Sequence, residues 1–401
     1  MNFDFTTWID RRGHDSIAVD LQENDFWKLP QGTTKPGFDK IPLWIADMCF
    51  PTAPSVTERI MSRAAHPIYG YYVPSDEYYD AIVRWHWESF GTDYIARENI
   101  GYENGVLGGV TSALRVLCTP GEPVLVHSPT YTGFTTQLGR NGFPTILSPL
   151  RMDEQGIFRM DLEDMEQKIR DHHIHAAILC SPHNPTGRVW ERRELEAAME
   201  LFHRYDVFVI SDEIWSDLTF FGHQHIPTQS VSEDARQRTI AFYSPSKTFN
   251  LAGLIGSYRL IFNERLRDQM DHYEALGHYN DMNVLSMHAL IGAYQPEGRV
   301  WMKELKTVLE RNIEKTCRFF ASVEGVSLTK PQGSYVVVPD FQFWCEKNGK
   351  RLDELLIAGV EVGVLWRDGR QFHIPYGIRM ALGLPEAKLD EVLERLCLYV
   401  L

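Results

Sequence analysis

Three short apolar runs, each followed at once by a polar motif, constrain the fold of this 401-residue chain more than any other feature. The runs at 176–180, 207–210 and 239–243 are typical of short buried strands. Amphipathic helices are predicted at 160–169 and 191–205, so strand and helix alternate through the middle of the chain. This alternation predicts an α/β fold, with a mostly parallel sheet covered by helices.

The polar motifs bring reactive side chains to the ends of these strands. They are Ser181-Pro182-His183-Asn184-Pro185-Thr186-Gly187-Arg188, Ser211-Asp212-Glu213-Ile214-Trp215 and Ser244-Pro245-Ser246-Lys247-Thr248-Phe249-Asn250. Because open α/β sheets bind ligands at the carboxyl ends of their strands, an amide, an acid and a lysine are expected to converge. A lysine amine can form a Schiff base with a carbonyl compound, and serine hydroxyls can hold a phosphate beside it. Taken alone, Lys247 would be interpreted as a solvated surface lysine.

Length and composition indicate a globular protein of two domains. With 44% hydrophobic residues, the chain can bury a large core. The sequence pattern changes after about residue 290, where a long charged helix is predicted at 299–320. We therefore expect a large domain at 50–290, with 1–49 and 291–401 forming a small domain and an N-terminal arm. The formal charge of -14 argues against nucleic acid or an anionic membrane as a partner.

The cysteines and the N-terminus indicate the cellular compartment. Six cysteines are scattered without a C-x-x-C pair or metal-ligand spacing, which predicts reduced structural thiols and no metal site. The first residues, interrupted by Asp4 and Asp10, have neither the basic start nor the apolar core of a signal peptide. No apolar run is long enough to span a bilayer. We expect a cytoplasmic protein.

The order of the motifs resembles that of the fold-type I pyridoxal-phosphate enzymes, the aspartate-aminotransferase-like superfamily. Together with Pro42-Leu43-Trp44-Ile45-Ala46-Asp47-Met48, the motifs resemble the MalY/PatB group of cysteine-S-conjugate β-lyases. The match runs from Asp10-Arg11-Arg12-Gly13 to Arg379, nearly the whole chain. This resemblance implies an aspartate-aminotransferase-like large domain, a smaller α+β domain, pyridoxal 5'-phosphate as the cofactor, and a homodimer with shared active sites.

The resemblance assigns the central catalytic roles. Lys247 would hold the cofactor as a Schiff base and, once freed, remove the Cα proton of an amino-acid substrate. Asp212 would keep the pyridine nitrogen protonated, although a helix N-cap is the alternative interpretation of this aspartate. Asn184 would contact the phenolic oxygen of the cofactor and the substrate. Ser244 would bind the phosphate, with Ser246 as a second donor.

Further cofactor contacts are implied elsewhere in the chain. A predicted helix begins near Val106 and Leu107, whose backbone amides would cradle the phosphate. Tyr131 would stack on the pyridine ring. Trp215 stands where aminotransferases commonly have tyrosine and the MalY/PatB group often has histidine, so its contact with the phenolic oxygen departs from the pattern.

An aromatic loop is implied to act on a neighbouring subunit. The resemblance places Tyr71 at the cofactor phosphate of the second chain, and we include this residue in the catalytic set. Tyr69 or Tyr72 is an alternative for this role, and simple packing is a further alternative for any of the three.

The substrate contacts are implied at both ends of the chain. Arg379 would clamp the α-carboxylate, a task that suits a planar guanidinium. The stretch that contains Trp44 and Ala46 would pass the same carboxylate. The aromatic rings of Trp44, Tyr71 and Trp215 suggest a pocket for a thioether side chain, with core packing as the alternative. Cys49 replaces an aspartate common in the group, and Ala381 stands where the family often has asparagine.

The resemblance implies a carbon–sulfur β-lyase that cleaves cystathionine or related S-substituted cysteines to a thiol, pyruvate and ammonia. An aminotransferase is the nearer alternative, and a non-catalytic regulatory protein that binds the cofactor is the farther one. The stretch at 251–256 is apolar and Arg259 comes late, whereas typical aminotransferases have a phosphate-binding arginine soon after the lysine. This departure favours the lyase group.

Overall fold

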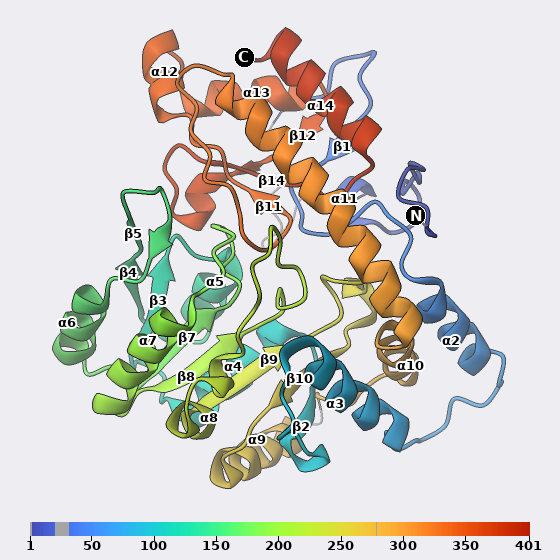
Figure 1. Cartoon of the computed structure of the whole chain (residues 1–401), viewed down its shortest axis with the longest axis vertical. Helices are drawn as coiled ribbons and strands as arrows, with labels where there is room; N and C mark the ends of the chain where they lie inside the picture. Colours follow the sequence, from blue (N-terminus) through green and yellow to red (C-terminus); the bar gives the residue numbers. More distant parts are fainter. Residues whose placement is uncertain (1, 21–31, 278) are drawn as a thin grey trace. The chain divides into compact units, whose positions relative to one another are not determined.

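The computed structural model describes residues 2–20, 32–277 and 279–401, and the chain divides into two compact units (Figure 1). Unit 1 comprises Met1–Pro51, Pro185–Gly187 and Glu304–Leu401, and unit 2 comprises Thr52–Asn184 and Arg188–Lys303. The division falls inside helix α11 (Pro296–Ala321). The domain limits predicted at 50 and 290 are not tested by this division and stay a prediction. Part of the predicted N-terminal arm, at 21–31, lies outside the described residues.

Unit 2 contains a sheet of seven strands among the described residues. Their order is β2 (Ile100–Glu103), β10 (Ser257–Leu260), β9 (Thr239–Tyr243), β8 (Phe208–Asp212), β7 (Ala176–Cys180), β3 (Val124–Ser128) and β4 (Thr145–Pro149). Strand β10 is antiparallel to both neighbours, and the strands from β9 to β4 are parallel. The predicted α/β fold with a mostly parallel sheet is confirmed.

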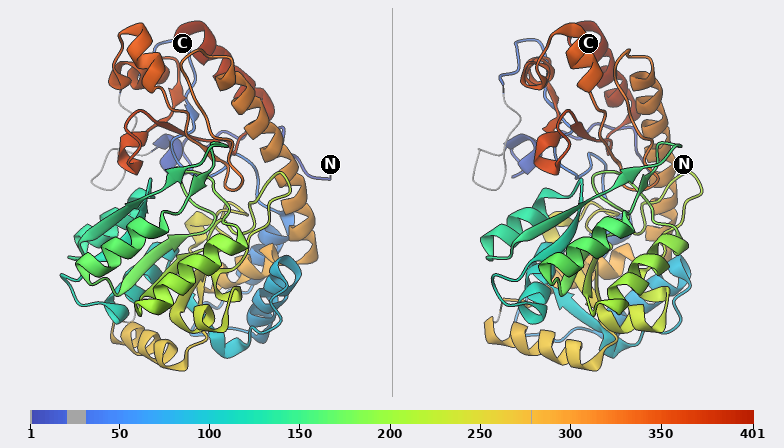
Figure 2. Two further views of the ribbon diagram at one scale, coloured as in Figure 1. Left: turned by 60° about the vertical axis from the view of Figure 1, so that its left-hand side comes forward. Right: turned by 90° about the vertical axis from the view of Figure 1, so that its left-hand side faces the viewer.

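Helices cover both faces of this sheet (Figure 2). One face packs on α4 (Val106–Leu117), α5 (Thr132–Arg140) and α9 (Glu264–Gly277), and the other on α6 (Leu162–His172), α7 (Arg192–Arg204) and α8 (Glu233–Arg238). Alternate strand residues point to opposite faces, so Val124 and Val126 join the first layer and Leu125 joins the second. Burial on both faces explains why the strands appear in the sequence as continuous apolar runs.

The remaining elements of unit 2 surround this core. They are α2 (Pro54–Ala64), α3 (Asp76–Phe90), α10 (Val284–Ala293), the short strands β5 (Arg151–Met152) and β6 (Phe158–Arg159), and the 3-10 turns η1 (Arg97–Asn99), η2 (Thr228–Ser230) and η3 (Ala252–Leu254). Helix α3 follows the N-cap residue Ser75 and buries Tyr78, Ile82 and Trp85.

Unit 1 combines short strands with helices, as expected for an α+β domain. Its elements besides α11 are α1 (Ile17–Asp20), β1 (Ile41–Pro42), β11 (Val336–Val337), α12 (Gln342–Asn348), α13 (Leu352–Glu361), β12 (Val364–Leu365), β13 (Arg367–Asp368), η4 (Gly369–Phe372), β14 (Ile378–Ala381) and α14 (Glu386–Tyr399). Strand β1 pairs with β12, and β14 pairs with β11 and β13. The buried Asn312 of α11 donates to the carbonyls of Leu382 and Leu384 at 3.0 and 2.8 Å. These bonds fix the chain that leaves β14.

All six cysteines are free thiols, and four of them are buried. This agrees with the structural role predicted for them. Among the residues that the structure describes, no helix has both the length and the apolar character needed to cross a bilayer.

Candidate active site

The loop after β9 holds Lys247 at the carboxyl end of the sheet. Its Nζ lies 5.7 Å from the centre of the Trp215 ring. The next residue, Thr248, donates its hydroxyl to Asp217 at 3.0 Å, and the following residue, Phe249, is fully buried. These contacts anchor the backbone beside the lysine, so its amine is held at the strand end.

Asp212 is the last residue of β8, which ends two residues later than the run predicted at 207–210. One carboxylate oxygen accepts the backbone N–H of Ile214 at 3.1 Å. Burial raises the pKa of Asp212 to about 7; the Ile214 bond and the positive charge of Lys247 oppose this rise, and the neighbouring Glu213 adds to it. A turn rather than a helix follows Asp212, so the alternative of a helix N-cap is wrong.

Glu213 lies beside this carboxyl but belongs to a separate buried network. It accepts hydrogen bonds from His225 Nε2 and the Tyr243 hydroxyl, both at 2.6 Å, from the Ser211 hydroxyl at 2.8 Å, and from the Thr228 N–H at 3.0 Å. Burial alone raises the pKa of Glu213, but His225 and the hydrogen bonds outweigh burial and hold it below its ordinary value. Sequence reasoning missed this network because its partners lie in three separate segments.

The loop after β7 presents Asn184. This residue is 5% exposed, and its Oδ1 has no hydrogen-bond partner among the described residues. The backbone N–H of Asn184 donates to Cys180 Sγ at 3.4 Å, and the N–H of His183 donates to the Arg188 carbonyl at 2.8 Å. Buried polar atoms are nearly always hydrogen-bonded, so the lack of a partner for Asn184 Oδ1 among the described residues indicates a contact with a polar ligand.

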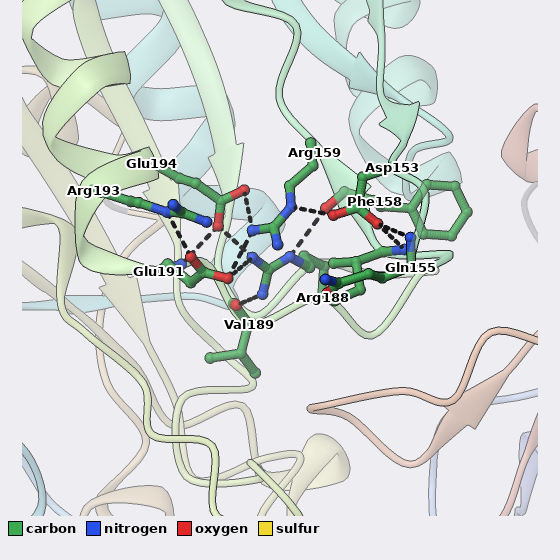
Figure 3. A network of polar contacts seen from close by, with 10 residues as sticks. Asp153, Gln155, Phe158, Arg159, Arg188, Val189, Glu191, Arg193 and Glu194 are labelled. Atoms are coloured by element: carbon green, nitrogen blue, oxygen red, sulfur yellow. Dashed lines mark hydrogen bonds and ion pairs between the residues drawn. The ribbon is translucent and has the colours of Figure 1, made fainter.

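A network of charges fixes the exit of this loop (Figure 3). The Arg188 side chain is 2% exposed, donates from Nε to the Phe158 carbonyl at 3.0 Å, and pairs with Glu191 at 3.2 Å and with Glu194. Arg159 of β6 pairs with Glu191 at 2.7 Å. The end of the loop is thereby tied to the start of α7 and to β6. The sequence motif includes Arg188 but does not indicate any of these partners.

Ser244 and Ser246 lie next to each other at the start of the lysine loop. Their hydroxyls are hydrogen-bonded, and the Ser246 N–H donates to Ser244 Oγ at 3.1 Å. Ser244 is buried, whereas Ser246 is half-buried. The pair offers two hydroxyls at one point, as an anion-binding site requires.

The start of α4 lies close to the ring of Tyr131. Helix α4 begins at Val106, after Gly105 with a φ of 82°, and the first amides of a helix have no acceptor within it. A Cβ placed on Gly133 would lie 2.3 Å from the Tyr131 ring and 2.9 Å from Leu107. The glycine therefore lets the predicted stacking ring and the predicted phosphate cradle approach each other.

The three tyrosines of the aromatic loop differ in their surroundings. The hydroxyl of Tyr69 donates to the Ala64 carbonyl at 2.7 Å, and that of Tyr72 donates to the Met282 carbonyl at 2.6 Å. The side chain of Tyr71 is fully exposed. Of the three candidates, Tyr71 is the one that projects away from its own chain.

The predicted substrate contacts belong to unit 1. Arg379 lies on β14, is 2% exposed, and donates to the Trp44 carbonyl at 3.4 Å. The Trp44 indole is fully buried, packs on Val360 and Leu365, and donates to the Ala18 carbonyl at 3.1 Å. This burial favours core packing for the indole, while the Trp44 backbone contacts the arginine.

Ala46 and Cys49 lie farther along the same segment. Ala46 is buried. Arg11 forms a double ion pair with Asp47 and lies 3.9 Å from Cys49 Sγ. Burial raises the pKa of Cys49 to about 11, so this thiol is neutral at physiological pH and does not replace the charge of an aspartate.

The three strand-end motifs meet at one edge of the unit 2 sheet. Cys180 of β7 is paired with Asp212 of β8, which is paired with Phe242 of β9, and the strands are parallel. The predicted convergence of an amide, an acid and a lysine is therefore found in the backbone register, and the charge of Lys247 acts on Asp212.

Comparisons with known proteins agree with this arrangement. Residues 39–396 match the family model of aminotransferase class I and II. Cystathionine beta-lyase PatB of Bacillus subtilis is 32% identical over 89% of this chain and 92% of its own length, and protein MalY of Escherichia coli is 30% identical over 97% and 96%. The crystal structure of cystalysin from Treponema denticola, which contains pyridoxal 5'-phosphate, covers 99% of this chain and 98% of its own at 27% identity and a TM-score of 0.89. The chain therefore belongs to the aminotransferase class I and II family.

Proposed function

We propose that the protein is a pyridoxal-phosphate-dependent carbon–sulfur β-lyase that cleaves S-substituted cysteines, such as cystathionine, to a thiol, pyruvate and ammonia. The observation that carries this proposal is the position of Lys247 and Asp212 at the ends of adjacent parallel strands, with the charge of one acting on the other. The names of PatB and cystalysin, and their coverage of nearly the whole chain, support it.

The residues of unit 2 fit this cofactor. Asp212 is a buried carboxyl with a pKa raised to about 7, poised to share a proton with the pyridine nitrogen. The amide oxygen of Asn184 has no hydrogen-bond partner among the described residues, which supports a contact with a polar ligand, and the amide can offer either of its ends to the ring substituents. Ser244, Ser246 and the first amides of α4 supply donors suited to a phosphate.

When bound, pyridoxal phosphate supplies an electron sink for the electron pair released at the substrate Cα. Lys247 removes the Cα proton, and the same amine then carries a proton that it can deliver to the departing sulfur. Asp212 holds the ring nitrogen protonated by its charge. Arg379 binds the α-carboxylate and so orients the Cα–H bond.

An aminotransferase is the competing function, because the same lysine would remove the same proton. Typical enzymes of that kind bind the phosphate with an arginine that follows the lysine. In this chain Arg259 is 2% exposed and pairs with Glu103 and Glu274, both at 2.7 Å. These ion pairs engage Arg259 at the β2–β10 edge of the sheet. Because Arg259 is engaged there, it does not serve as the phosphate-binding arginine of an aminotransferase, and this favours the lyase.

We also infer a cytoplasmic homodimer in which each subunit lends Tyr71 to the cofactor of the other. The full exposure of Tyr71, and the bonds that hold Tyr69 and Tyr72 to their own chain, support this assignment. The six free thiols suit a reducing compartment.

A substrate panel tests the reaction. Purified protein is incubated with cystathionine and S-alkyl cysteines without any keto acid, and pyruvate and free thiol are measured. The proposal predicts equal amounts of both. Turnover that needs a keto acid and releases no thiol would establish the aminotransferase instead.

Borohydride reduction tests the cofactor site. The reduced cofactor is expected on the peptide that contains Lys247, identified by mass spectrometry. Its attachment to another lysine would overturn the assignment.

A further inference from the structure

Asp217 joins three segments of unit 2 through a single carboxylate. It lies in the turn that follows β8 and is buried. Its Oδ1 accepts the indole N–H of Trp85 on α3, and its Oδ2 accepts the hydroxyl of Thr248, both at 3.0 Å. An indole N–H can only donate, and a carboxylate offers a separate oxygen to each of the two donors. The lysine loop is therefore tied to α3 through the side chain of Asp217.

The indole of Trp85 is itself held by two neighbours. It is fully buried and stacks on Tyr294, with ring centres 4.5 Å apart and an angle of 7° between the ring planes. The Cζ of Arg299 lies 4.1 Å from the centre of the Trp85 ring, and Arg299 pairs with Glu88 at 3.0 Å. Since a ring packed in this way keeps one orientation, its N–H donates to Asp217 from a fixed direction.

The two residues after Lys247 are both fixed by this cluster. Thr248 is fully buried and donates to the carboxylate. The fully buried ring of Phe249 packs edge-on against Trp85, with ring centres 5.8 Å apart. The N–H of Phe249 also donates to the carbonyl of Pro245 at 2.8 Å, which closes the loop around Lys247. The backbone of the lysine is thus restrained on both sides of its Cα.

A lysine that condenses with an aldehyde must bring its amine to one point. Its side chain is long and flexible, so the position of its Cα decides how often the amine reaches that point. Holding two reacting groups in place raises the rate, and a misplacement of about 1 Å can lower it about a hundredfold. Asp217 supplies such a restraint at the residue that follows Lys247.

We propose that Asp217 is a positioning residue for Lys247, and that Trp85 sets the orientation of Asp217. Helix α3 then controls how readily the lysine forms its Schiff base, through one indole N–H and one threonine hydroxyl. The inference rests on the assignment of Lys247 in the proposed function. It does not depend on the fate of the substrate, because a lyase and an aminotransferase would use the same lysine.

Two forms of the cofactor separate the lysine from the rest of the site. Pyridoxal phosphate condenses with the amine and releases water, whereas pyridoxine phosphate has an alcohol in place of the aldehyde and binds without a covalent bond. The rate of Schiff-base formation is measured by stopped-flow absorbance on cofactor-free protein, and borohydride reduction identifies the lysine that reacted. The dissociation constant of pyridoxine phosphate is measured by calorimetry on the same samples.

The variants remove one donor at a time. Thr248→Val removes the hydroxyl and keeps the shape of the side chain, so Schiff-base formation should slow by about tenfold or more. Thr248→Ser keeps the hydroxyl and should retain the wild-type rate. Trp85→Phe removes the indole N–H and should slow the reaction by about threefold to tenfold. All three should bind pyridoxine phosphate with the wild-type dissociation constant.

The matched control is Trp366→Phe in unit 1. The Trp366 indole is also fully buried, and it donates to the carbonyl of Leu356 at 3.0 Å. This substitution removes the same kind of buried hydrogen bond without touching the lysine loop, so the rate of Schiff-base formation should stay at its wild-type value.

An equal loss of affinity for pyridoxine phosphate in Thr248→Val would overturn the inference, because the bond would then serve the fold or the whole site. A wild-type rate in Thr248→Val, or an equal loss of rate in Thr248→Ser, would overturn it as well. Should Trp85→Phe fail to fold, the two Thr248 variants decide the outcome.

These measurements use no amino-acid substrate, so they separate this inference from the reaction. Absence of thiol and pyruvate from the wild type with S-substituted cysteines would refute the proposed lyase and leave the Schiff-base rates valid. Attachment of the reduced cofactor to another lysine would refute the assignment of Lys247. Attachment to Lys247 with an unchanged rate in Thr248→Val would refute the role of Asp217 alone.

Discussion

Asp212 and Glu213 are consecutive carboxyls whose pKa values are shifted in opposite directions. Burial raises the pKa of Asp212 to about 7, whereas His225 and four hydrogen bonds hold the pKa of Glu213 below its ordinary value. Because neighbouring side chains at a strand end point in opposite directions, one carboxyl is available to a ligand and the other is enclosed. Under the proposed function, Asp212 serves the cofactor and Glu213 serves the fold.

The raised pKa of Asp212 predicts a pH dependence of stability in the cofactor-free protein. Its folded value, about 7, lies above the ordinary value of 3.8, so the protonated carboxyl stabilises the fold at low pH. This contribution is lost as the pH rises through 7. Between about pH 5 and pH 7 the free energy of unfolding should fall by roughly 1–3 kcal/mol more in the wild type than in Asp212→Asn. Denaturant titrations measure it, and parallel pH profiles would contradict the account.

Glu213→Gln should destabilise the fold strongly. The substitution replaces a buried carboxylate that accepts four hydrogen bonds by an amide that cannot accept all of them, at a cost of about 1–3 kcal/mol near neutral pH. Since the pKa of Glu213 is lowered in the folded state, its stabilisation is present at neutral pH and is lost as the pH falls through that lowered value. Urea unfolding at neutral pH checks the magnitude. A loss below about 1 kcal/mol would show that the network carries little stability.

The fold and the central motifs were predictable because their signals are local. Strands β7 and β9 coincide with the apolar runs at 176–180 and 239–243, since residues buried on both faces must all be apolar. The register then follows from the parallel arrangement. The partners of Glu213 and Arg188 were not predictable, because His225, Arg159 and Glu194 become neighbours only after the chain has folded. A single sequence contains no periodicity that marks such contacts.

Arg188→Met should cost far more than the loss of a neighbouring arginine of the same network. Arg188 is 2% exposed, and its removal takes away a buried positive charge that pairs with Glu194. This predicts a loss of about 3 kcal/mol in unfolding free energy. Arg193 pairs with the same Glu191 but is 76% exposed, so Arg193→Met is the matched control and should cost at most about 1 kcal/mol. Thermal and denaturant unfolding compare the two. Equal losses would show that burial does not set the strength of this network.

Tyr71→Phe should weaken cofactor retention without dissociating the dimer. The substitution removes one hydroxyl and keeps the aromatic ring, so the affinity for the cofactor should fall by about fivefold to tenfold. Dialysis followed by absorbance measures retention, and sedimentation measures the assembly. Tyr69→Phe serves as the control, because the Tyr69 hydroxyl donates to its own chain. A fully active monomer would contradict the shared site.

The roles of individual site residues were harder to predict than their positions. Trp44 was a candidate for the substrate pocket, yet its indole is fully buried and only its carbonyl contacts Arg379. The sequence placed this residue correctly but did not show where its ring points. Arg367 was not singled out in the sequence, because its place opposite Arg379 follows from a two-residue strand that no apolar pattern marks.

The state of the cofactor after turnover tests the central claim most directly. The protein is loaded with pyridoxal phosphate, supplied with an excess of an S-alkyl cysteine and no keto acid, and the cofactor is then released and identified by chromatography. A β-lyase regenerates the aldehyde form at every turnover, so we predict many equivalents of pyruvate with the cofactor still as pyridoxal phosphate. Conversion of the cofactor to pyridoxamine phosphate, with turnover stopping after about one equivalent, would contradict the account.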